Sequence, residues 1–296
     1  EGLRVPGAYY DTRKPMILSA STLGAPQASL GNVIDSLASA GISGIELRVA
    51  PGAIVQPGMD PEALRRIRGA IEAAGIQLTG LASYVKIAQP GPDKPVVAEL
   101  ASALEMAHIL GAPAVRVFPG AAAQPAGPMA RPRLIEAQDE VDERAARRLS
   151  QAAAAADRYT VLPVIETHDS HPSGRDIARL AAKVKTPVGV VWDLMHPWRV
   201  GESLAETWEA LRPWLTAGLG SVQVKDARLP QDSTPSLIGE GSLPCEEFGN
   251  LLVSQGYSGV VTLELEAVWY PAAPPFAIAL TSARRWSARH WKQEAA

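Results

Sequence analysis

The chain has 296 residues, of which 47% are hydrophobic, 20% charged and 5% aromatic, and its formal net charge is −3. These proportions are typical of a globular protein and exclude a disordered or fibrous chain. No run of five like charges occurs, so neither nucleic acid nor a charged membrane surface is an expected partner. The single cysteine, Cys245, and the lack of an apolar run near the roughly 20 residues of a membrane span predict a cytoplasmic protein.

Apolar, β-branched stretches alternate along the chain with segments whose apolar residues recur at helical spacing. Asp60 and Pro61 suit the start of a helix, with an acceptor at the N-cap and proline in the first turn. The expected strands are 16–22, 44–48, 78–87, 114–120, 161–166, 188–196, 221–228 and 259–266. The expected helices are 29–40, 60–74, 96–110, one from about 133 through 156, 174–184, 203–217, 245–255 and 275–291.

Eight strand–helix units in succession predict an α/β protein, a closed (β/α)₈ TIM barrel forming a single domain over 1–296. Residues 1–15 are expected as a surface lead-in, and 275–296 as a C-terminal helix and tail. An open, doubly wound sheet is disfavoured because the first strand-to-helix turn, SASTLGAP, lacks the G-x-G-x-x-G pattern of dinucleotide-binding sheets.

Three of the expected strands end in an acidic residue: Glu166, Asp193 and Glu264. Active sites of TIM barrels lie at the carboxyl ends of the strands, so these side chains are expected to meet. Three converging carboxylates would repel one another unless a cation neutralised them. Oxygen ligands favour Mg²⁺ or Mn²⁺, and the amide oxygen of Gln223 is a candidate fourth ligand.

Several segments in chain order resemble one family. They are GISGIELR at 41–48, VIETH at 164–168, WDLMHP at 192–197 with the later GES, VQVKDAR at 222–228, IGEGSLP at 238–244 and GYSGVVTLELE at 256–266. Across essentially the whole chain they resemble the xylose isomerase-like TIM-barrel superfamily of sugar and sugar-phosphate isomerases and epimerases.

The resemblance implies a divalent metal held by Glu, Asp, His and Glu, to which Glu166, Asp193 and Glu264 correspond in three positions. Gln223 stands where the family usually has histidine in a His-x-Lys-Asp motif, although relatives similar to hydroxypyruvate isomerase also carry glutamine. Metal identity is therefore open, with Mn²⁺ or Mg²⁺ favoured and Zn²⁺ the alternative.

Other polar residues are candidates for holding substrate. His196 matches a family histidine that usually contacts substrate oxygens. Lys225, oriented by Asp226, is a candidate either for holding a substrate oxygen or for offsetting the charge of the metal-site carboxylates. Glu46 resembles a family glutamate that joins the polar network. His168, two residues beyond Glu166 on the same strand face, completes the set with Arg116 and Arg228, which suit anionic groups. His171, in contrast, is expected on a loop surface.

The chemistry expected of this site is proton abstraction next to a carbonyl, through an enediolate. Either Glu166 or Glu264 removes the proton and the other returns it, which gives epimerisation or isomerisation of a sugar or related α-hydroxy carbonyl compound. Aromatic residues near the strand ends favour a carbohydrate-like or aromatic-bearing small molecule. Because relatives are often dimers or tetramers, the resemblance also implies a possible homo-oligomer.

Three alternatives stand beside this hypothesis. The same barrel could carry a metal-dependent lyase, a dehydratase or a glycoside-cleaving enzyme, or it could be a non-catalytic binding subunit with a degenerate metal site. The apurinic-site endonucleases of the superfamily need several zinc-ligating histidines and a basic surface. Five histidines, most of them misplaced, and a negative net charge argue against that branch.

Overall fold

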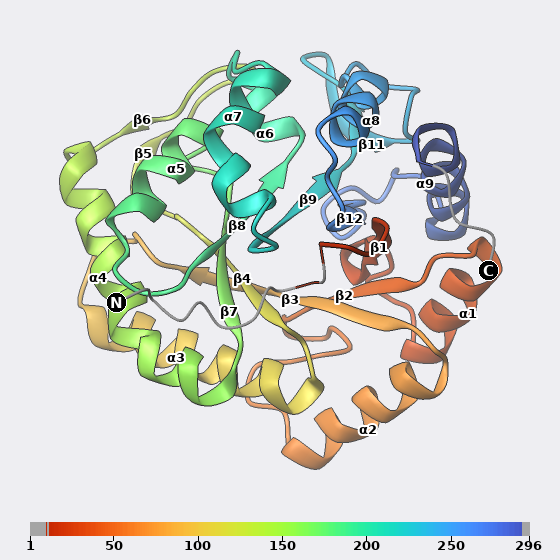
Figure 1. The fold of residues 1–296 in the computed structure, drawn as a ribbon, viewed down its shortest axis with the longest axis horizontal. Helices are drawn as coiled ribbons and strands as arrows, with labels where there is room; N and C mark the ends of the chain where they lie inside the picture. The colour runs from red at the N-terminus through yellow and green to blue at the C-terminus, as the bar shows by residue number, and fades with distance from the viewer. Residues whose placement is uncertain (1–9, 11, 292–296) are drawn as a thin grey trace.

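Eight parallel strands close into a barrel in the order β1-β12-β9-β8-β7-β4-β3-β2, surrounded by helices (Figure 1). The computed structural model describes residues 10 and 12–291, so most of the predicted lead-in and residues 292–296 of the tail lie outside it. The barrel strands are β1 (Ile17–Ser21), β2 (Gly44–Arg48), β3 (Gln77–Lys86), β4 (Ala114–Phe118), β7 (Leu162–Glu166), β8 (Gly189–Asp193), β9 (Gly220–Val224) and β12 (Val260–Leu263). The predicted TIM-barrel fold is confirmed.

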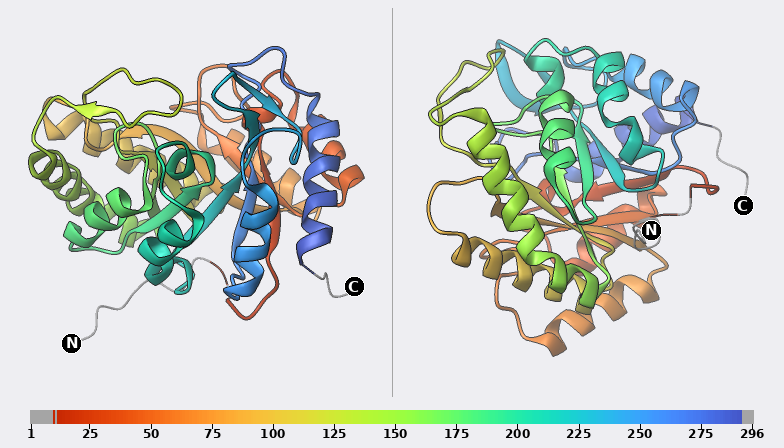
Figure 2. Two further views of the ribbon diagram at one scale, coloured as in Figure 1. Left: turned by 90° about the horizontal axis from the view of Figure 1, so that it is seen from above. Right: turned by 60° about the vertical axis from the view of Figure 1, so that its left-hand side comes forward.

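Each barrel strand is followed by at least one helix, and α9 closes the ring by packing against α1 and α8 (Figure 2). The helices are α1 (Leu30–Ala40), α2 (Pro61–Ala73), α3 (Asp93–Leu110), α4 (Gln138–Tyr159), α5 (Gly174–Lys183), α6 (Met195–Arg199), α7 (Leu204–Leu215), α8 (Cys245–Ser254) and α9 (Phe276–His290), with a short 3-10 turn, η1, at Thr22–Gly24. Local sequence sets several of their ends. Asp60 caps α2 through its carboxylate, as predicted, and Gly41 ends α1 in the left-handed region with φ 66°.

The core has two parts because strand side chains alternate between the two faces of the barrel wall. The main cluster joins the outward-facing strand residues to the helices. A small separate cluster of Ala114, Leu162, Val164 and Val191 belongs to the alternate, inward-facing positions. Farther along the same strands, towards their carboxyl ends, the inward positions become polar. The barrel interior is therefore apolar towards the amino ends of the strands and charged at their carboxyl ends, which form the mouth of the barrel.

Several predicted strands are shorter than expected. β8 stops at Asp193, whose Oδ1 accepts hydrogen bonds from the backbone N–H groups of Met195 (2.7 Å) and His196 (3.3 Å). That carboxylate starts a helical turn, so His196 lies on α6 instead of on the strand.

The predicted strand 221–228 is divided in a similar way. β9 ends at Val224, and β10 (Asp226–Arg228) leaves the barrel to pair with β11 (Asp232–Ser236). A second unpredicted ribbon, β5 (Ala123–Gln124) with β6 (Arg133–Leu134), lies within the long loop after β4. The alternation of apolar and polar residues along one strand could not predict these two antiparallel pairs, because it does not show which strands pair.

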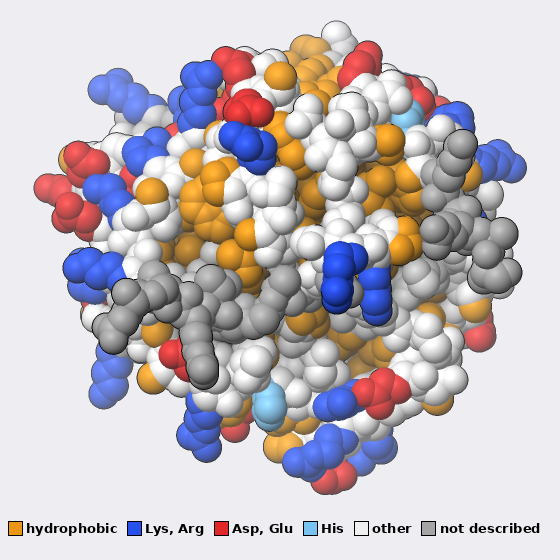
Figure 3. Space-filling model, in the orientation of Figure 1, with side chains coloured by type: hydrophobic (Ala, Val, Ile, Leu, Met, Phe, Trp, Pro, Cys, Tyr) orange, Lys and Arg blue, Asp and Glu red, His pale blue; other side chains and the backbone are white. Residues whose placement is uncertain are grey.

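Basic and acidic side chains are interspersed around the edge of the face shown in Figure 3, with hydrophobic side chains visible between them. This distribution agrees with the near-balanced composition. Among the described residues, no helix combines the length and apolar character needed to cross a membrane.

Candidate active site

The charged side chains that the sequence analysis singled out converge at the mouth of the barrel. Glu166, Asp193 and Glu264, from β7, β8 and the residue after β12, each offer a ligand oxygen within 4.8 Å of the others. All three are buried, with at most 5% of any residue exposed. We call these three residues the carboxylate cluster. Such closely spaced anions require positive charge nearby.

Lys225 supplies part of that charge. Its Nζ lies 2.8 Å from Asp193 Oδ2 and also forms ion pairs with Glu264 and Glu266. Burial opposes its charge, but the surrounding carboxylates outweigh burial and raise the pKa of Lys225 well above its usual value. The ammonium group is therefore held protonated inside the carboxylate cluster.

Arg116 neutralises Glu166 from the other side. Its Nη1 lies 3.0 Å from Glu166 Oε2, both side chains are buried, and its guanidinium stacks 3.8 Å from the ring centroid of Phe118. Burial raises the pKa of Glu166 well above the ordinary range, Arg116 opposes that rise, and the nearby charges of Glu264 and Asp193 add to it. Burial therefore favours the protonated form of Glu166.

Glu46 lies in the same polar network. Burial raises the pKa of Glu46 to about 7, with Arg116 opposing the rise and Glu264 adding to it. Its Oε1 is buried and has no hydrogen-bond partner among the described residues. A carboxyl group with such a pKa changes its charge near neutral pH.

The side chain of Gln223 supports cation binding. It is 1% exposed, and neither its Oε1 nor its Nε2 has a hydrogen-bond partner in the described part of the chain. Its register neighbours are Asp193 of the carboxylate cluster on β8 and Thr262 on β12, two residues before Glu264. Because a buried amide without a partner is costly, an oxygen ligand position for a divalent ion is a physical explanation for Gln223.

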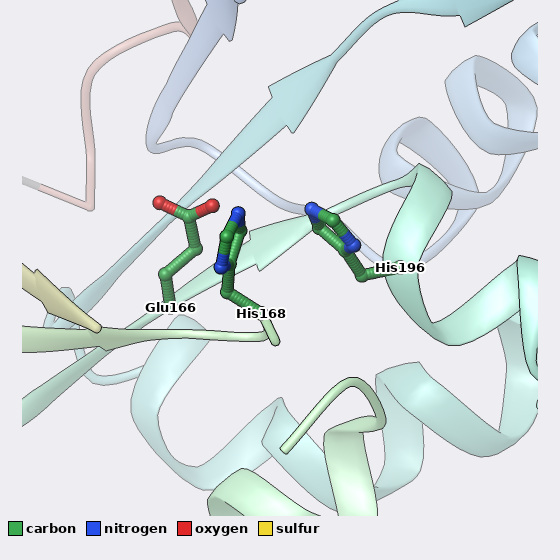
Figure 4. Close-up of side chains that lie close together, drawn as sticks. All are labelled: Glu166, His168 and His196. Atoms are coloured by element: carbon green, nitrogen blue, oxygen red, sulfur yellow. The ribbon is translucent and has the colours of Figure 1, made fainter. Parts of the chain in front are cut away.

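A second set of metal-binding side chains shares Glu166. Ligand atoms of Glu166, His168 and His196 also lie within 4.8 Å of one another. Figure 4 shows His168 beside the Glu166 carboxylate and His196 facing it from the start of α6. Both ring nitrogens of buried His196 lack hydrogen-bond partners among the described residues, and burial, assisted by His168 and Lys225, lowers its pKa well below the usual value. His196 is therefore neutral, which is the form that ligates metals.

A small cavity of about 150 Å³ opens onto these groups. Its lining includes predicted residues, His196, Lys225 and Glu264, together with Met195, Arg199 and Tyr270. The donor sets and the cavity are compatible with a divalent ion and a small polar substrate.

Comparison with known proteins agrees with this geometry. Residues 34–289 match the model of the xylose isomerase-like TIM barrel family. The chain belongs to that family. A putative hydroxypyruvate isomerase from Streptomyces coelicolor is 30% identical over 246 residues, covering 75% of this chain and 81% of the relative.

Solved structures share the fold at lower sequence identity. D-psicose 3-epimerase from Clostridium cellulolyticum, solved with D-tagatose, is 16% identical with a TM-score of 0.73, covering 93% of this chain and 99% of that one. A probable 3-DHS dehydratase from Bacillus anthracis is 15% identical with a TM-score of 0.70, covering 91% and 98%. The shared xylose isomerase-like barrel therefore accompanies more than one named reaction.

Arg228 and Asp226 do not take the roles expected of them in this xylose isomerase-like barrel, although Asp226 lines the small cavity. Arg228 is exposed on β10, where its Nε donates to the carbonyl of Glu240 (3.3 Å), and it does not line the cavity. Asp226 does not orient Lys225. Its carboxylate accepts hydrogen bonds from the backbone N–H groups of Gly239 (2.9 Å), Gly241 (3.0 Å) and Leu243 (3.1 Å). Asp226 fixes the loop that follows β11.

The expectation of a surface position for His171 is wrong, because His171 is fully buried. Its Nε2 lies 2.8 Å from Asp142 Oδ1, and its Nδ1 lies 2.9 Å from Ser170 Oγ. These contacts hold the turn between His168 and Ser170, in which Asp169 has φ 38°. The sequence did not indicate this pairing, because Asp142 lies on α4, 29 residues before His171 in the chain.

The sequence analysis did not single out Arg199 or Tyr84. Arg199, on α6, lines the small cavity with a buried Nε that lacks a partner in the described residues. Tyr84, on β3, has its ring 5.7 Å from the guanidinium of Arg116. The spacing of Arg199 three residues after His196 would have indicated a shared helical face, but His196 was predicted as the end of a strand and no helix was predicted before residue 203.

Proposed function

We propose that this protein is a divalent-metal-dependent isomerase or epimerase that acts on a sugar or related α-hydroxy carbonyl compound through an enediolate. One observation carries the proposal: two buried glutamates of different strand ends, Glu166 and Glu264, approach within 4.8 Å beside a small cavity, and one of them has a raised pKa. Such a pair of carboxyl groups can remove a proton from carbon and return it.

The two glutamates are suited to different parts of the reaction. Glu264 is ion-paired with Lys225 and offers an anionic oxygen that can accept the proton next to the carbonyl. Glu166, whose pKa is raised, holds and returns a proton. Return to the same carbon from the opposite face gives epimerisation, whereas return to the neighbouring carbon gives isomerisation.

A divalent ion fits the residues that surround the substrate position. Glu166, Asp193 and Glu264 would hold it with the unpartnered Gln223. When bound, the ion would polarise the carbonyl and hydroxyl oxygens of the substrate. Lys225 would then give up its contacts with Asp193 and Glu264 while keeping Glu266, and its ammonium could donate to a substrate oxygen. His196 and His168 would contribute further polar contacts. Mn²⁺ and Mg²⁺ suit the oxygen donors, and Zn²⁺ suits the histidines.

Elimination of water is a second candidate, because the Glu166 carboxyl group, whose protonated form burial favours, could also protonate a departing hydroxyl oxygen. A barrel with a degenerate, empty site is disfavoured, since Gln223 and His196 are buried without hydrogen-bond partners among the described residues and are therefore suited to a ligand.

The test is proton exchange in D₂O with metal-loaded protein and a panel of small α-hydroxy ketones and ketoses, including hydroxypyruvate. Deuterium incorporation next to the carbonyl, accompanied by an isomer or epimer, is expected. Exchange without rearrangement, or loss of water from the product, would contradict the proposal in favour of a lyase. Absence of Mn²⁺, Mg²⁺ and Zn²⁺ binding at near-stoichiometric occupancy would remove its metal component.

A further inference from the structure

A second cavity lies beside the carboxylate cluster and differs from it in chemistry. It has a volume of about 410 Å³, in the range of sites for small molecules. Apolar side chains form most of its wall, among them Val49, Val85, Ala103 and Met106. The aromatic rings of Tyr84 and Trp269 complete it. Hydroxypyruvate or a simple sugar bound at the carboxylates would leave this space unfilled.

Two segments of the chain reach both the larger cavity and the surroundings of the carboxylate cluster, although the two cavities share no lining residue. The segment after β12 presents Glu264 and Glu266 to the small cavity and then Trp269 to the larger one. The backbone N–H of Trp269 donates to the carbonyl of Glu266 (3.0 Å). This short turn directs Glu266 to the small cavity and Trp269 to the larger one. On the other side, Tyr84 lines the larger cavity while its ring lies 5.7 Å from the guanidinium of Arg116.

Arg48 organises the aromatic part of the wall. Its Nε donates to the hydroxyl of Tyr84 (2.8 Å), and its guanidinium carbon lies 5.4 Å from the Tyr84 ring centroid and 5.8 Å from that of Trp269. A cation near two ring faces holds both rings in place. Trp269 is nonetheless 58% exposed, an unusual position for a large aromatic side chain.

The polar groups of this wall do not suit sugar hydroxyls. Ser83 Oγ is already used, donating to the carbonyl of Arg116 at 2.6 Å, and Glu99 and Ser102 lie exposed on α3 at the surface. A sugar ring placed against the apolar wall would lose hydrogen bonds to water without replacement. A flat, apolar group gives up no hydrogen bonds to water when it enters this cavity, and it gains contact with the aromatic rings.

We propose that this cavity receives an aromatic substituent of the same substrate whose α-hydroxy carbonyl group lies at the carboxylate cluster. The inference rests on the proposed function for the position of the reacting group, and it narrows the substrate to aryl-bearing α-hydroxy carbonyl compounds. The aromatic group stacks on Trp269 and contacts Met106 and Ala103.

Binding of two probes tests the inference independently of turnover. We compare 2-hydroxyacetophenone, an α-hydroxy ketone with a phenyl group, with dihydroxyacetone, which lacks the ring, by isothermal titration calorimetry on metal-loaded protein. The phenyl compound is expected to bind at least tenfold more tightly. Trp269→Ala, at an exposed position, and Ala103→Leu, which fills the cavity, should each remove this preference and leave dihydroxyacetone binding unchanged. Val253→Ala, at an exposed apolar residue of α8, is the matched control and should retain the preference.

The outcomes separate this inference from the proposed function. Equal affinity for the two probes, or a phenyl preference that survives both cavity variants, would overturn the aromatic site. Preferential phenyl binding that depends on Trp269, in a protein that exchanges no proton in D₂O with either probe, would leave the aromatic site standing and remove the enediolate chemistry. Glu264→Gln should keep the phenyl preference while losing exchange.

Discussion

Arg116 Nη1 lies 3.0 Å from Glu166 Oε2 in a pair that is almost completely buried. The pair takes part in both proposed functions of the barrel mouth, metal binding and proton transfer. Glu166 belongs to both candidate donor sets and is also the proposed proton carrier. Its partner Arg116 also contacts the rings of Phe118 and Tyr84. Changes to Arg116 should therefore affect stability and chemistry together.

Arg116→Met should destabilise the fold by about 1–3 kcal/mol, because it leaves the Glu166 carboxyl group buried without its partner. Urea denaturation followed by circular dichroism measures the change in unfolding free energy. The double variant Arg116→Met/Glu166→Gln should recover much of the loss. If the double variant is as unstable as the sum of the single variants, the pair is not coupled.

Glu264→Gln should slow proton exchange by about 10²–10⁴-fold, since the amide cannot accept the proton. Glu266→Gln is the matched control: Glu266 also contacts Lys225 but is not a member of the carboxylate cluster, and a much smaller loss is expected. Exchange is followed by NMR in D₂O with metal bound to each variant. A loss for Glu266→Gln as large as that for Glu264→Gln would contradict the assignment of the base.

Lys225→Met should strengthen divalent cation binding by at least tenfold. The substitution removes the ammonium that now neutralises Asp193 and Glu264, so an added ion meets less competition. Thermal unfolding in EDTA and in increasing Mn²⁺ reports the effect, with a lower midpoint without metal and a larger rise with it than in the original protein. Unchanged Mn²⁺ affinity would show that Lys225 and the ion do not share the carboxylates.

Glu46 should make stability depend on pH. Its pKa of about 7 in the folded state exceeds the ordinary glutamate value of 4.5, so the folded protein binds more protons than the unfolded chain between these values. Stability should consequently fall as pH rises from about 4.5 to 7, by up to about 3 kcal/mol, and stay level with respect to this group above pH 7. Glu46→Gln should flatten the profile measured by urea denaturation. A profile with the same slope in the variant would exclude Glu46 as its source.

His196→Asn should weaken Co²⁺ and Zn²⁺ binding more than Mg²⁺ binding if the ion uses the histidines, because imidazole favours the softer ions. The visible spectrum of bound Co²⁺ reports nitrogen ligation directly. His108→Asn, on α3 outside both donor sets, is the control. Identical Co²⁺ spectra for the original protein and His196→Asn would exclude His196 as a ligand of the ion.

The fold was largely predictable because barrel strands and helices differ in periodicity over whole segments. The convergence of Glu166, Asp193 and Glu264 followed from the rule that parallel strands end on one face. The position of Lys225 beside these carboxylates was predicted as well. The bonding of Asp226 to the loop at Gly239–Leu243 and the pairing of His171 with Asp142 could not be predicted in this way, since each depends on a contact between distant segments. Asp193 also ends its own strand, because its carboxylate accepts hydrogen bonds from the backbone of α6. The alternation of apolar and polar residues along the strand does not predict this end.

Asp226 has a consequence for protein engineering. A Cβ at Gly241 would lie 2.0 Å from Asp226 Oδ1, and three backbone N–H groups of the loop converge on the same carboxylate. Libraries that alter substrate choice should leave Gly239–Leu243 unchanged in sequence and length. Diversity is better placed at Trp269, Gln56 and Pro57, whose side chains are exposed.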